Sequence, residues 1–542
     1  MRLLTYIQTT SIKPVLIVSV LLTLLAGTEA LAAPGDITLA STSDTGVKGN
    51  ADSSDPSLSA DGTKVAFGSL ATNLDPADTD STHDVYVKDL ATGNIILAST
   101  SDTGTKGSGV EPSLSADGTV VAFRSSATNL DPGDTDFIAD VYVKDLATGD
   151  ITLASTSDAG TKGNSHSYKP SLSADGTRVA FSSDATNLDP GDTDGVSDVY
   201  VKNLATGDIT LASTSDSGTT GNDYSLDPSL SADGTVVAFW SFANNLDPGD
   251  TDRYPPDVYV KDLVTGDIAL ASTSDGGVKG NDYSSEPILS ADGTRVAFWS
   301  FATNLDPGDT DGPADVYVKD LVTGEITLVS TSDGGVKGEG PSYDPSLSAD
   351  GRKVAFWSHA TNLDPGDPFP NEDAYVKDLL TGDIALASTS DEGVHGNGAS
   401  LMPSLSADGT RVAFSSDATN LYPGDSTWVD VYVKEPGGAG PLGPGAAPSP
   451  KEVSLKAKPK KVEKGDKTKL TVLVSPCGGH EGDMVDIYKG SKKIATKTTD
   501  SACSTKHRVK MHKTAKFQAI SPVQDADHLA GTSTKVRVKV TN

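Results

Sequence analysis

Aspartate-rich loops recur along this chain with a spacing that suits a hard cation. One loop carries Asp189, Asp192, Asp194 and Asp198 around Gly195. A second loop repeats the arrangement with Asp306, Asp309, Asp311 and Asp315. Carboxylates spaced two to four residues apart around a glycine turn are what calcium loops use. The pattern therefore predicts Ca²⁺ sites, although no glutamate closes either loop as it does in an EF-hand.

The same aspartates also suit a purely structural role. Asp side chains accept hydrogen bonds from nearby backbone N–H groups, and the adjacent Pro-Gly pairs favour turns. Three more loops keep all four acids: Asp75, Asp78, Asp80 and Asp84; Asp131, Asp134, Asp136 and Asp140; Asp247, Asp250, Asp252 and Asp257. In two others the pattern is eroded by Pro368-Phe369 and by Tyr422. Both interpretations stay open here, a cation loop and a turn that adds only charge.

Aromatic residues are concentrated in one part of the chain. Trp240, Trp299 and Trp357 each follow a Phe in a β-type run, and Tyr224, Tyr283 and Tyr343 lie in the loops that precede the same runs. Such a cluster could bind a sugar or a peptide, and it could equally form packing between neighbouring units. We keep these six residues as candidate ligand-binding residues.

Motifs for catalysis are missing from the sequence. There is no Gly-x-Ser-x-Gly elbow and no His-x-x-x-His or His-Glu-x-x-His pair. His83, His166, His359 and His395 fall in separate loops, which predicts solvated side chains. The many aspartates leave an acid/base pair conceivable without selecting one.

These residues belong to seven copies of one unit. Pro-Ser-Leu-Ser-Ala-Asp-Gly, or Pro-Ile-Leu-Ser-Ala-Asp-Gly in one copy, begins at Pro56, Pro112, Pro170, Pro228, Pro287, Pro345 and Pro403. In the third unit we predict strands at 171–173, 178–182, 198–202 and 209–213, with a hairpin turn at Asp175-Gly176. Four strands per unit without a helical pattern predict an all-β, seven-bladed β-propeller over residues 34–435.

The two ends of this region predict how the ring closes. The last unit stops after its third strand, at residues 430–434, whereas residues 36–41 form a fourth strand with no unit before it. An N-terminal strand that completes the last blade would remove an exposed sheet edge.

The repeat carries a family resemblance. Pro-Ser-Leu-Ser-Ala-Asp-Gly-Thr-x-Val-Ala-Phe-x-Ser, followed by Asp-Val-Tyr-Val-Lys-Asp-Leu-x-Thr-Gly, resembles the TolB-type propeller repeat of exported bacterial proteins. The resemblance covers every unit, but Ala60 and its equivalents stand where the family usually has Pro before Asp-Gly. The resemblance implies the fold, and the family's varied functions are not transferable.

Loop lengths predict which face of the propeller carries function. The first and third connections of each unit are short and share one face, whereas the second connection and the crossing to the next unit are long and share the other. Because function on rigid scaffolds concentrates in such loops, we expect a protein or glycan ligand on this long-loop face.

The N-terminus predicts export. Arg2 and Lys13 precede an apolar run at 15–26 and an Ala30-Leu31-Ala32 cleavage pattern, so residues 1–32 resemble a secretory signal peptide. A retained membrane anchor is the alternative, but the run is short for a spanning helix. We expect no transmembrane segment after cleavage and a secreted, periplasmic or cell-surface location.

The net charge of −31 conceals two bodies of opposite sign. Residues 1–450 carry a net charge of −42, and residues 451–542 carry +11. The Pro- and Gly-rich residues 436–450 suit a linker between them. The acidic balance excludes nucleic acid as a partner of the whole chain.

The basic region predicts a second, smaller domain. Seven short alternating runs in 451–542 indicate a β-sandwich that resembles bacterial immunoglobulin-like modules. The two cysteines, Cys477 and Cys503, fall here, and export favours a disulfide between them. The lysines suit an anionic cell-envelope polymer, or they only keep a strand face solvated.

Two functions are compatible with these observations. The first is an exported, non-catalytic binding or scaffold protein with one decorated propeller face. The alternative is an extracytoplasmic carbohydrate-active enzyme that uses carboxylates on that face. Paired acids in a dense pocket at the ring centre would favour the enzyme, and dispersed acids on a flat face would favour the scaffold.

Overall fold

The computed structural model describes residues 36–435, apart from positions 368 and 426, and the strands between residues 449 and 541 as backbone. The predicted signal peptide, most of the predicted linker and both cysteines lie outside the described residues. The described residues form strands and turns only, so none of them builds a helix that could cross a membrane. The chain divides into two compact units, Met1–Ala439 and Gly440–Asn542.

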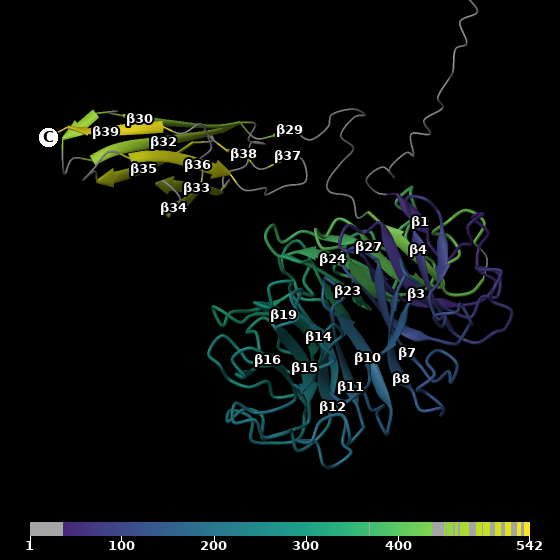
Figure 1. The fold of residues 1–542 in the computed structure, drawn as a ribbon. Helices are drawn as coiled ribbons and strands as arrows, with labels where there is room; N and C mark the ends of the chain where they lie inside the picture. The colour runs from purple at the N-terminus through teal and green to yellow at the C-terminus, as the bar shows by residue number, and fades with distance from the viewer. Residues whose placement is uncertain are drawn as a thin grey trace, which may run out of the picture. The chain divides into compact units, whose positions relative to one another are not determined.

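The first unit is the predicted seven-bladed propeller, built from seven four-stranded antiparallel sheets. Figure 1 shows the sheets following one another in chain order, from purple to green. Blades one to three are β2 (Ser53–Leu58), β3 (Lys64–Ser69), β4 (Asp84–Asp89), β5 (Ile95–Leu97); β6 (Val110–Leu114), β7 (Val120–Ser125), β8 (Asp140–Asp145), β9 (Ile151–Leu153); β10 (Ser167–Leu172), β11 (Arg178–Ser183), β12 (Asp198–Asn203), β13 (Ile209–Leu211).

The remaining four blades repeat this order. They are β14 (Ser225–Leu230), β15 (Val236–Ser241), β16 (Asp257–Asp262), β17 (Ile268–Leu270); β18 (Ser284–Leu289), β19 (Arg295–Ser300), β20 (Asp315–Asp320), β21 (Ile326–Leu328); β22 (Ser342–Leu347), β23 (Lys353–Ser358), β24 (Asp373–Asp378), β25 (Ile384–Leu386); and β26 (Ser400–Leu405), β27 (Val412–Ser416), β28 (Asp430–Lys434) with β1 (Ile37–Leu39).

The predicted ring closure is confirmed. Strand β1 pairs antiparallel with β28, Ile37 opposite Lys434 and Leu39 opposite Tyr432, and completes the seventh sheet in the order β1-β28-β27-β26. Figure 1 shows this N-terminal strand among the green strands of the last blade. The closure covers the edge of β28 and gives blade seven the same four strands as every other blade.

Each blade has the same core. In blade three, Phe181 and Tyr200 stack with their ring centroids 6.0 Å apart, and both side chains are fully buried. Leu172 and Val179 lie in the same buried cluster together with Val143 of blade two. The alternating pattern therefore fills the space between neighbouring blades, which is why both sides of these strands are apolar.

A second closed ring joins the short turns of the face opposite the long loops. The backbone N–H of each turn alanine donates to the carbonyl of the next blade's alanine, through Ala60, Ala116, Ala174, Ala232, Ala291, Ala349, Ala407 and back to Ala60. Proline has no N–H to donate, so this ring gives a physical reason for the departure from the Pro-Asp-Gly of TolB-type repeats. Gly176 completes its turn at φ 67°, as predicted for the Asp175-Gly176 hairpin.

The second unit contains two main sheets. One has the order β30 (Glu452–Lys458), β32 (Lys467–Ser475), β35 (Ser504–Lys510); the other has the order β31 (Lys461–Glu463), β39 (Val536–Thr541), β36 (Ala515–Ser521), β33 (Met484–Lys489), β34 (Lys492–Thr498), with β38 (Gly531–Thr532) beside β36. Two short strands, β29 (Ser449–Pro450) and β37 (His528–Leu529), pair with each other. All seven predicted runs are strands, and the β-sandwich itself stays a prediction.

Candidate binding face

In six of the seven blades, the acids of the long second connection meet a basic side chain from the following crossing. In blade five the Lys337 ammonium lies 2.8 Å from Oδ2 of Asp315 and 3.7 Å from Oδ1 of Asp309, and it also contacts Asp311. We call the acids that meet in this way the acid cluster of a blade. Five other blades share the arrangement: Lys106 with Asp78, Asp80 and Asp84; Lys162 with Asp134, Asp136 and Asp140; Lys279 with Asp250, Asp252 and Asp257; His395 with Asp367 and Asp373; Lys48 with Asp425 and Asp430.

Two acids of each cluster are buried and held by fixed donors. In blade five the Tyr317 hydroxyl donates to Oδ2 of Asp309 at 2.6 Å, and the Ser330 hydroxyl donates to Oδ1 of Asp315 at 2.7 Å. The first aspartate of the loop, Asp306, instead accepts the backbone N–H of Gly308 at 2.7 Å. The turn interpretation thus holds for the first acid of the loop, and the second acid also accepts a backbone N–H, that of Asp311 at 3.3 Å, while the later acids face a lysine as well.

Burial and the lysine act in opposite directions on the buried acids. Burial raises the pKa of Asp315 to about 6, although the hydrogen bond from Lys337 lowers it. Burial would lower the pKa of Lys337, but its hydrogen bonds to Asp311 and Asp315 outweigh burial and raise it. The lysine is therefore held charged among carboxylates that burial disfavours as anions.

Blade three is the exception. Its cluster of Asp192, Asp194 and Asp198 has the same geometry, but Thr220 stands where the other blades carry Lys or His. Burial raises the pKa of Asp198 to about 7; the Ser213 hydroxyl lowers it, and the two neighbouring aspartates raise it. Of the two loops first singled out for Ca²⁺, the loop of blade five has its acids around a lysine, and only the loop of blade three does not.

One histidine prediction was wrong. His395 is not a solvated side chain, because it lies 2.8 Å from Asp373 and 3.3 Å from Asp367 and takes the place of the lysine in blade six. The alignment of His395 with Lys337 in the repeat, 58 positions earlier, was the sequence signal for this role.

The predicted aromatic residues form a continuous arc at the long-loop ends of the inner strands. Tyr283 lies between Trp240 and Trp299, with ring centroids 5.9 and 5.3 Å away, and Tyr343 lies between Trp299 and Trp357, at 5.2 and 4.8 Å. These five residues are the aromatic arc. Four of its rings are half-buried and only Trp240 is buried, so the arc packs blades four to six together and also reaches solvent. The sixth predicted residue, Tyr224, is 49% exposed and takes no part in these ring contacts.

A ring of seven side chains lines the axial channel behind this arc. In each innermost strand the residue before the proline sits in a break of the pairing register with φ between 48° and 56°. The seven residues are Asp55, Glu111, Lys169, Asp227, Glu286, Asp344 and Met402. With the prolines they line an open cavity of about 370 Å³. This ring was not predicted, although the variable residue before each repeated proline was a sequence signal for it.

The indoles of the arc connect it to the channel acids. The Trp240 indole N–H donates to Asp227 at 2.7 Å, that of Trp299 to Glu286 at 2.8 Å, and that of Trp357 to Asp344 at 2.7 Å. Burial raises the pKa of Glu286 to about 9; Asp344 raises it too, and the Trp299 indole lowers it. The channel therefore contains a paired acid that keeps its proton at neutral pH.

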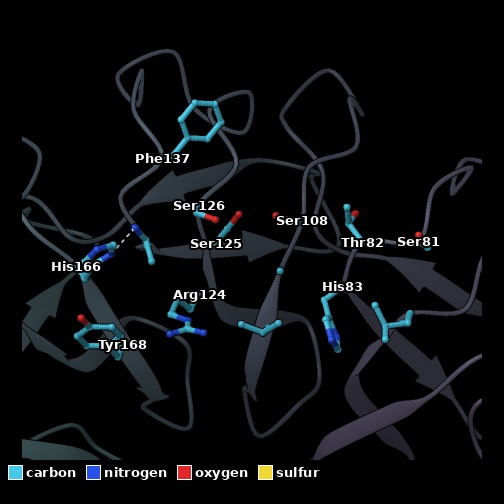
Figure 2. Close-up of a pocket in the computed structure, with 14 residues that line it drawn as sticks. Ser81, Thr82, His83, Ser108, Arg124, Ser125, Ser126, Phe137, His166 and Tyr168 are labelled. Carbon is cyan, nitrogen blue, oxygen red and sulfur yellow. Dashed lines mark hydrogen bonds between the residues drawn. The ribbon is translucent and has the colours of Figure 1, made fainter.

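A polar cleft of about 590 Å³ lies on the same face across blades one to three. Figure 2 shows Arg124, His83, His166 and Tyr168 around it, with Phe137 on a loop above them. The Arg124 guanidinium lies 5.7 Å from the centre of the Tyr168 ring. Loops that are far apart in the sequence thus bring His83 and His166 to one cleft, which was not predicted.

Comparisons with known proteins give structural neighbours only. A TolB from Agrobacterium tumefaciens is 16% identical, over 51% of this chain and 80% of its own, with a TM-score of 0.33. The WD40 repeats of RRP9 are 10% identical over 75% of this chain and 99% of theirs, with a TM-score of 0.40. The extracellular domain of the hybrid two-component system BT3049 from B. thetaiotaomicron is 9% identical over 94% of this chain and 58% of its own, at a TM-score of 0.40. No protein-family model and no curated protein matches the sequence.

Proposed function

We propose that the protein is an exported, non-catalytic binding protein that holds a glycan on the long-loop face of its propeller. The observation that carries this proposal is the aromatic arc, whose rings contact one another in a row across three blades, with Tyr283 stacked on Trp299 and four of the five rings partly open to solvent. A sugar presents C–H faces that stack on aromatic rings and hydroxyls that need polar partners. The aromatic arc offers rings for the C–H faces to stack on, and the channel acids offer hydrogen-bond partners for the hydroxyls.

The arrangement of this face supports a ligand that extends beyond the arc. The arc occupies blades four to six, and the polar cleft occupies blades one to three of the same face. Tyr254, 73% exposed, adds a ring 5.1 Å from Phe242 at the outer side of the arc. Binding sites of this kind combine aromatic surface with a few fixed polar groups.

A glycan array probed with the mature chain and with Tyr283→Ala tests this function. We expect a defined set of glycans to bind the mature chain and the variant to lose at least about tenfold in affinity, because the central ring of the arc is removed. Val322→Ala is the matched control, since Val322 is 76% exposed in a short turn of the opposite face of the same blade. Equal binding by Tyr283→Ala and the mature chain would reject the arc as the site.

The carbohydrate-active enzyme remains a second candidate because of Glu286 and Asp344. Glycoside hydrolysis uses a protonated acid and a second carboxylate about 5 to 10 Å apart. Glu286 and Asp344 lie within hydrogen-bond reach of each other, so a substrate would have to separate them. These acids lie on the innermost strands β18 and β22 at the ring centre, where paired acids were expected to favour the enzyme. Release of reducing sugar by the mature chain, abolished in Glu286→Gln, would establish the enzyme; binding without release would favour the binding protein.

The location and the role of the basic module belong to the same proposal. The apolar N-terminal run, the TolB-type repeat and the basic charge of residues 451–542 support export and attachment to an anionic envelope polymer. Sedimentation with cell envelopes should require residues 451–542 and should weaken as salt rises, because screening reduces the attraction. Sedimentation that salt leaves unchanged would reject attachment by charge.

A further inference from the structure

Thr220 makes blade three different from the six other blades. In every blade an isolated backbone bridge fixes the residue that overhangs the acid cluster, for example Thr331 to Lys337 in blade five and Thr214 to Thr220 in blade three. Thr220 carries no charge, and its hydroxyl donates to the carbonyl of Gly191 at 3.2 Å. The backbone position that places a Lys or His side chain over the acid cluster in the six other blades therefore places an uncharged threonine there in blade three.

One oxygen of blade three is left without the partner that its equivalents have. Oδ2 of the last acid contacts a Lys or His nitrogen at 2.7 to 2.9 Å in the six other blades. In blade three this atom is Oδ2 of Asp198, whose residue is 1% exposed and which has no hydrogen-bond partner among the described residues. A buried carboxylate oxygen without a partner is costly.

The other groups of the cluster keep their places around this oxygen. Asp192 is held by the Tyr200 hydroxyl at 2.7 Å, and Asp198 by the Ser213 hydroxyl at 2.6 Å through its other oxygen. One carboxylate oxygen from each of Asp192, Asp194 and Asp198 lies within 4.8 Å of the other two. Oxygens around a calcium ion lie 2.3 to 2.6 Å from it, so this separation is short enough for all three to reach one ion.

We propose that Asp192, Asp194 and Asp198 of blade three bind a single Ca²⁺ ion in the position that a lysine ammonium or an imidazole occupies in the six other blades. The donors are all hard oxygens, which suit Ca²⁺ and not a softer transition metal. Asp194 is exposed, so water can complete the coordination from that side. This site goes beyond the proposed glycan binding and does not depend on it.

Exchanging the residue over the cluster tests the site in both directions. After removal of metal with a chelator, calorimetric titration with CaCl₂ should give one site for the mature chain, none for Thr220→Lys and two for Lys337→Thr. Thr220→Lys recreates the arrangement of the other blades and Lys337→Thr recreates that of blade three. We expect a dissociation constant of about 1 mM or tighter, as in extracellular calcium modules.

Terbium luminescence gives a second measurement that does not depend on Thr220→Lys folding correctly. Tb³⁺ bound to Asp192 would be excited through Tyr200, and Asp194→Asn, which changes an exposed acid, should lower the luminescence at least about tenfold. The proposal is overturned if the mature chain shows no calcium heat at about 10 mM, if Thr220→Lys binds as the mature chain does, or if Mg²⁺ binds and Ca²⁺ does not.

Discussion

Blades three and five carry the same Asp-Pro-Gly-Asp-Thr-Asp-Gly loop but surround it with different side chains. Over the acid cluster, blade three has Thr220 and blade five has Lys337. In the channel, Lys169 of blade three corresponds to Glu286 of blade five, and Ser182 corresponds to Trp299 in the aromatic arc. The loop motif therefore sets the backbone and the acids, while residues on other connections decide whether it is a closed ion pair or an open site.

The largest effect should follow from removing the lysine of blade five. Lys337→Met leaves Asp309 and Asp315, both buried, without their cation. Because breaking a buried pair costs about 3 to 5 kcal/mol, we expect the free energy of unfolding in urea to fall by about that amount. Val336→Met, at a 60% exposed neighbour, is the control. A loss below about 1 kcal/mol would show that the ion pair is not what stabilises this loop.

Glu286 in the channel of blade five predicts that the stability of the protein depends on pH. The pKa of Glu286 is raised from 4.5 to about 9, so the folded protein keeps a proton that the unfolded chain releases. The stability from this proton is complete below pH 4.5 and is lost as the pH rises through about 9. The melting temperature of the unsubstituted protein should therefore decline across this range more steeply than that of Glu286→Gln.

Two controls sharpen this pH comparison. Glu325→Gln changes an exposed acid in the short turn of the same blade and should keep the steep decline. Lys169→Gln changes the corresponding channel position of blade three and should not flatten it. Equal slopes for Glu286→Gln and the unsubstituted protein would contradict a retained proton on Glu286.

The propeller could be predicted because its signals are local and repeated. The Asp-Gly turns, the alternating Asp-Val-Tyr-Val-Lys strand and the orphan strand at residues 36–41 each constrain the chain on their own, and seven copies reinforce them. The observed strand β10 begins four residues before the predicted one, because the bulge at Lys169 and Pro170 breaks the pairing pattern without ending the strand.

The sites were less predictable because they depend on contacts between distant residues. Lys337 lies 22 positions after Asp315, beyond the whole fourth strand, and only the folded blade brings the two together. The aromatic arc was found because three tryptophans stand out by type, whereas the channel acids required knowledge of which side chains the bulges turn toward the axis. Composition identified the acids, but only their neighbours distinguish an ion pair from a cation site.

Removing one tyrosine hydroxyl from blade three or from blade five should lower stability less than removing Lys337 does, and calcium should distinguish the two variants. Tyr200→Phe and Tyr317→Phe each remove the donor to a buried carboxylate, Asp192 or Asp309, and should each lower the free energy of unfolding by about 1 to 3 kcal/mol. Added Ca²⁺ should restore part of the loss for Tyr200→Phe only, since its cluster lacks a lysine. Identical recovery of both variants in calcium would erase the distinction between the blades.

The smallest effect concerns a link between neighbouring blades. The Ser171 hydroxyl of blade three accepts the backbone N–H of Leu230 in blade four at 3.0 Å, whereas blade five has Ile288 at this position, packed in an apolar cluster. Ser171→Ala should lower the free energy of unfolding by about 1 kcal/mol, because the Leu230 N–H loses an acceptor. Ile288→Ser should not gain stability, since the new hydroxyl replaces apolar surface that is already buried. If Ile288→Ser is instead stabilising in urea unfolding, the hydrogen bond outweighs the apolar contact, and the serine is the better link between blades.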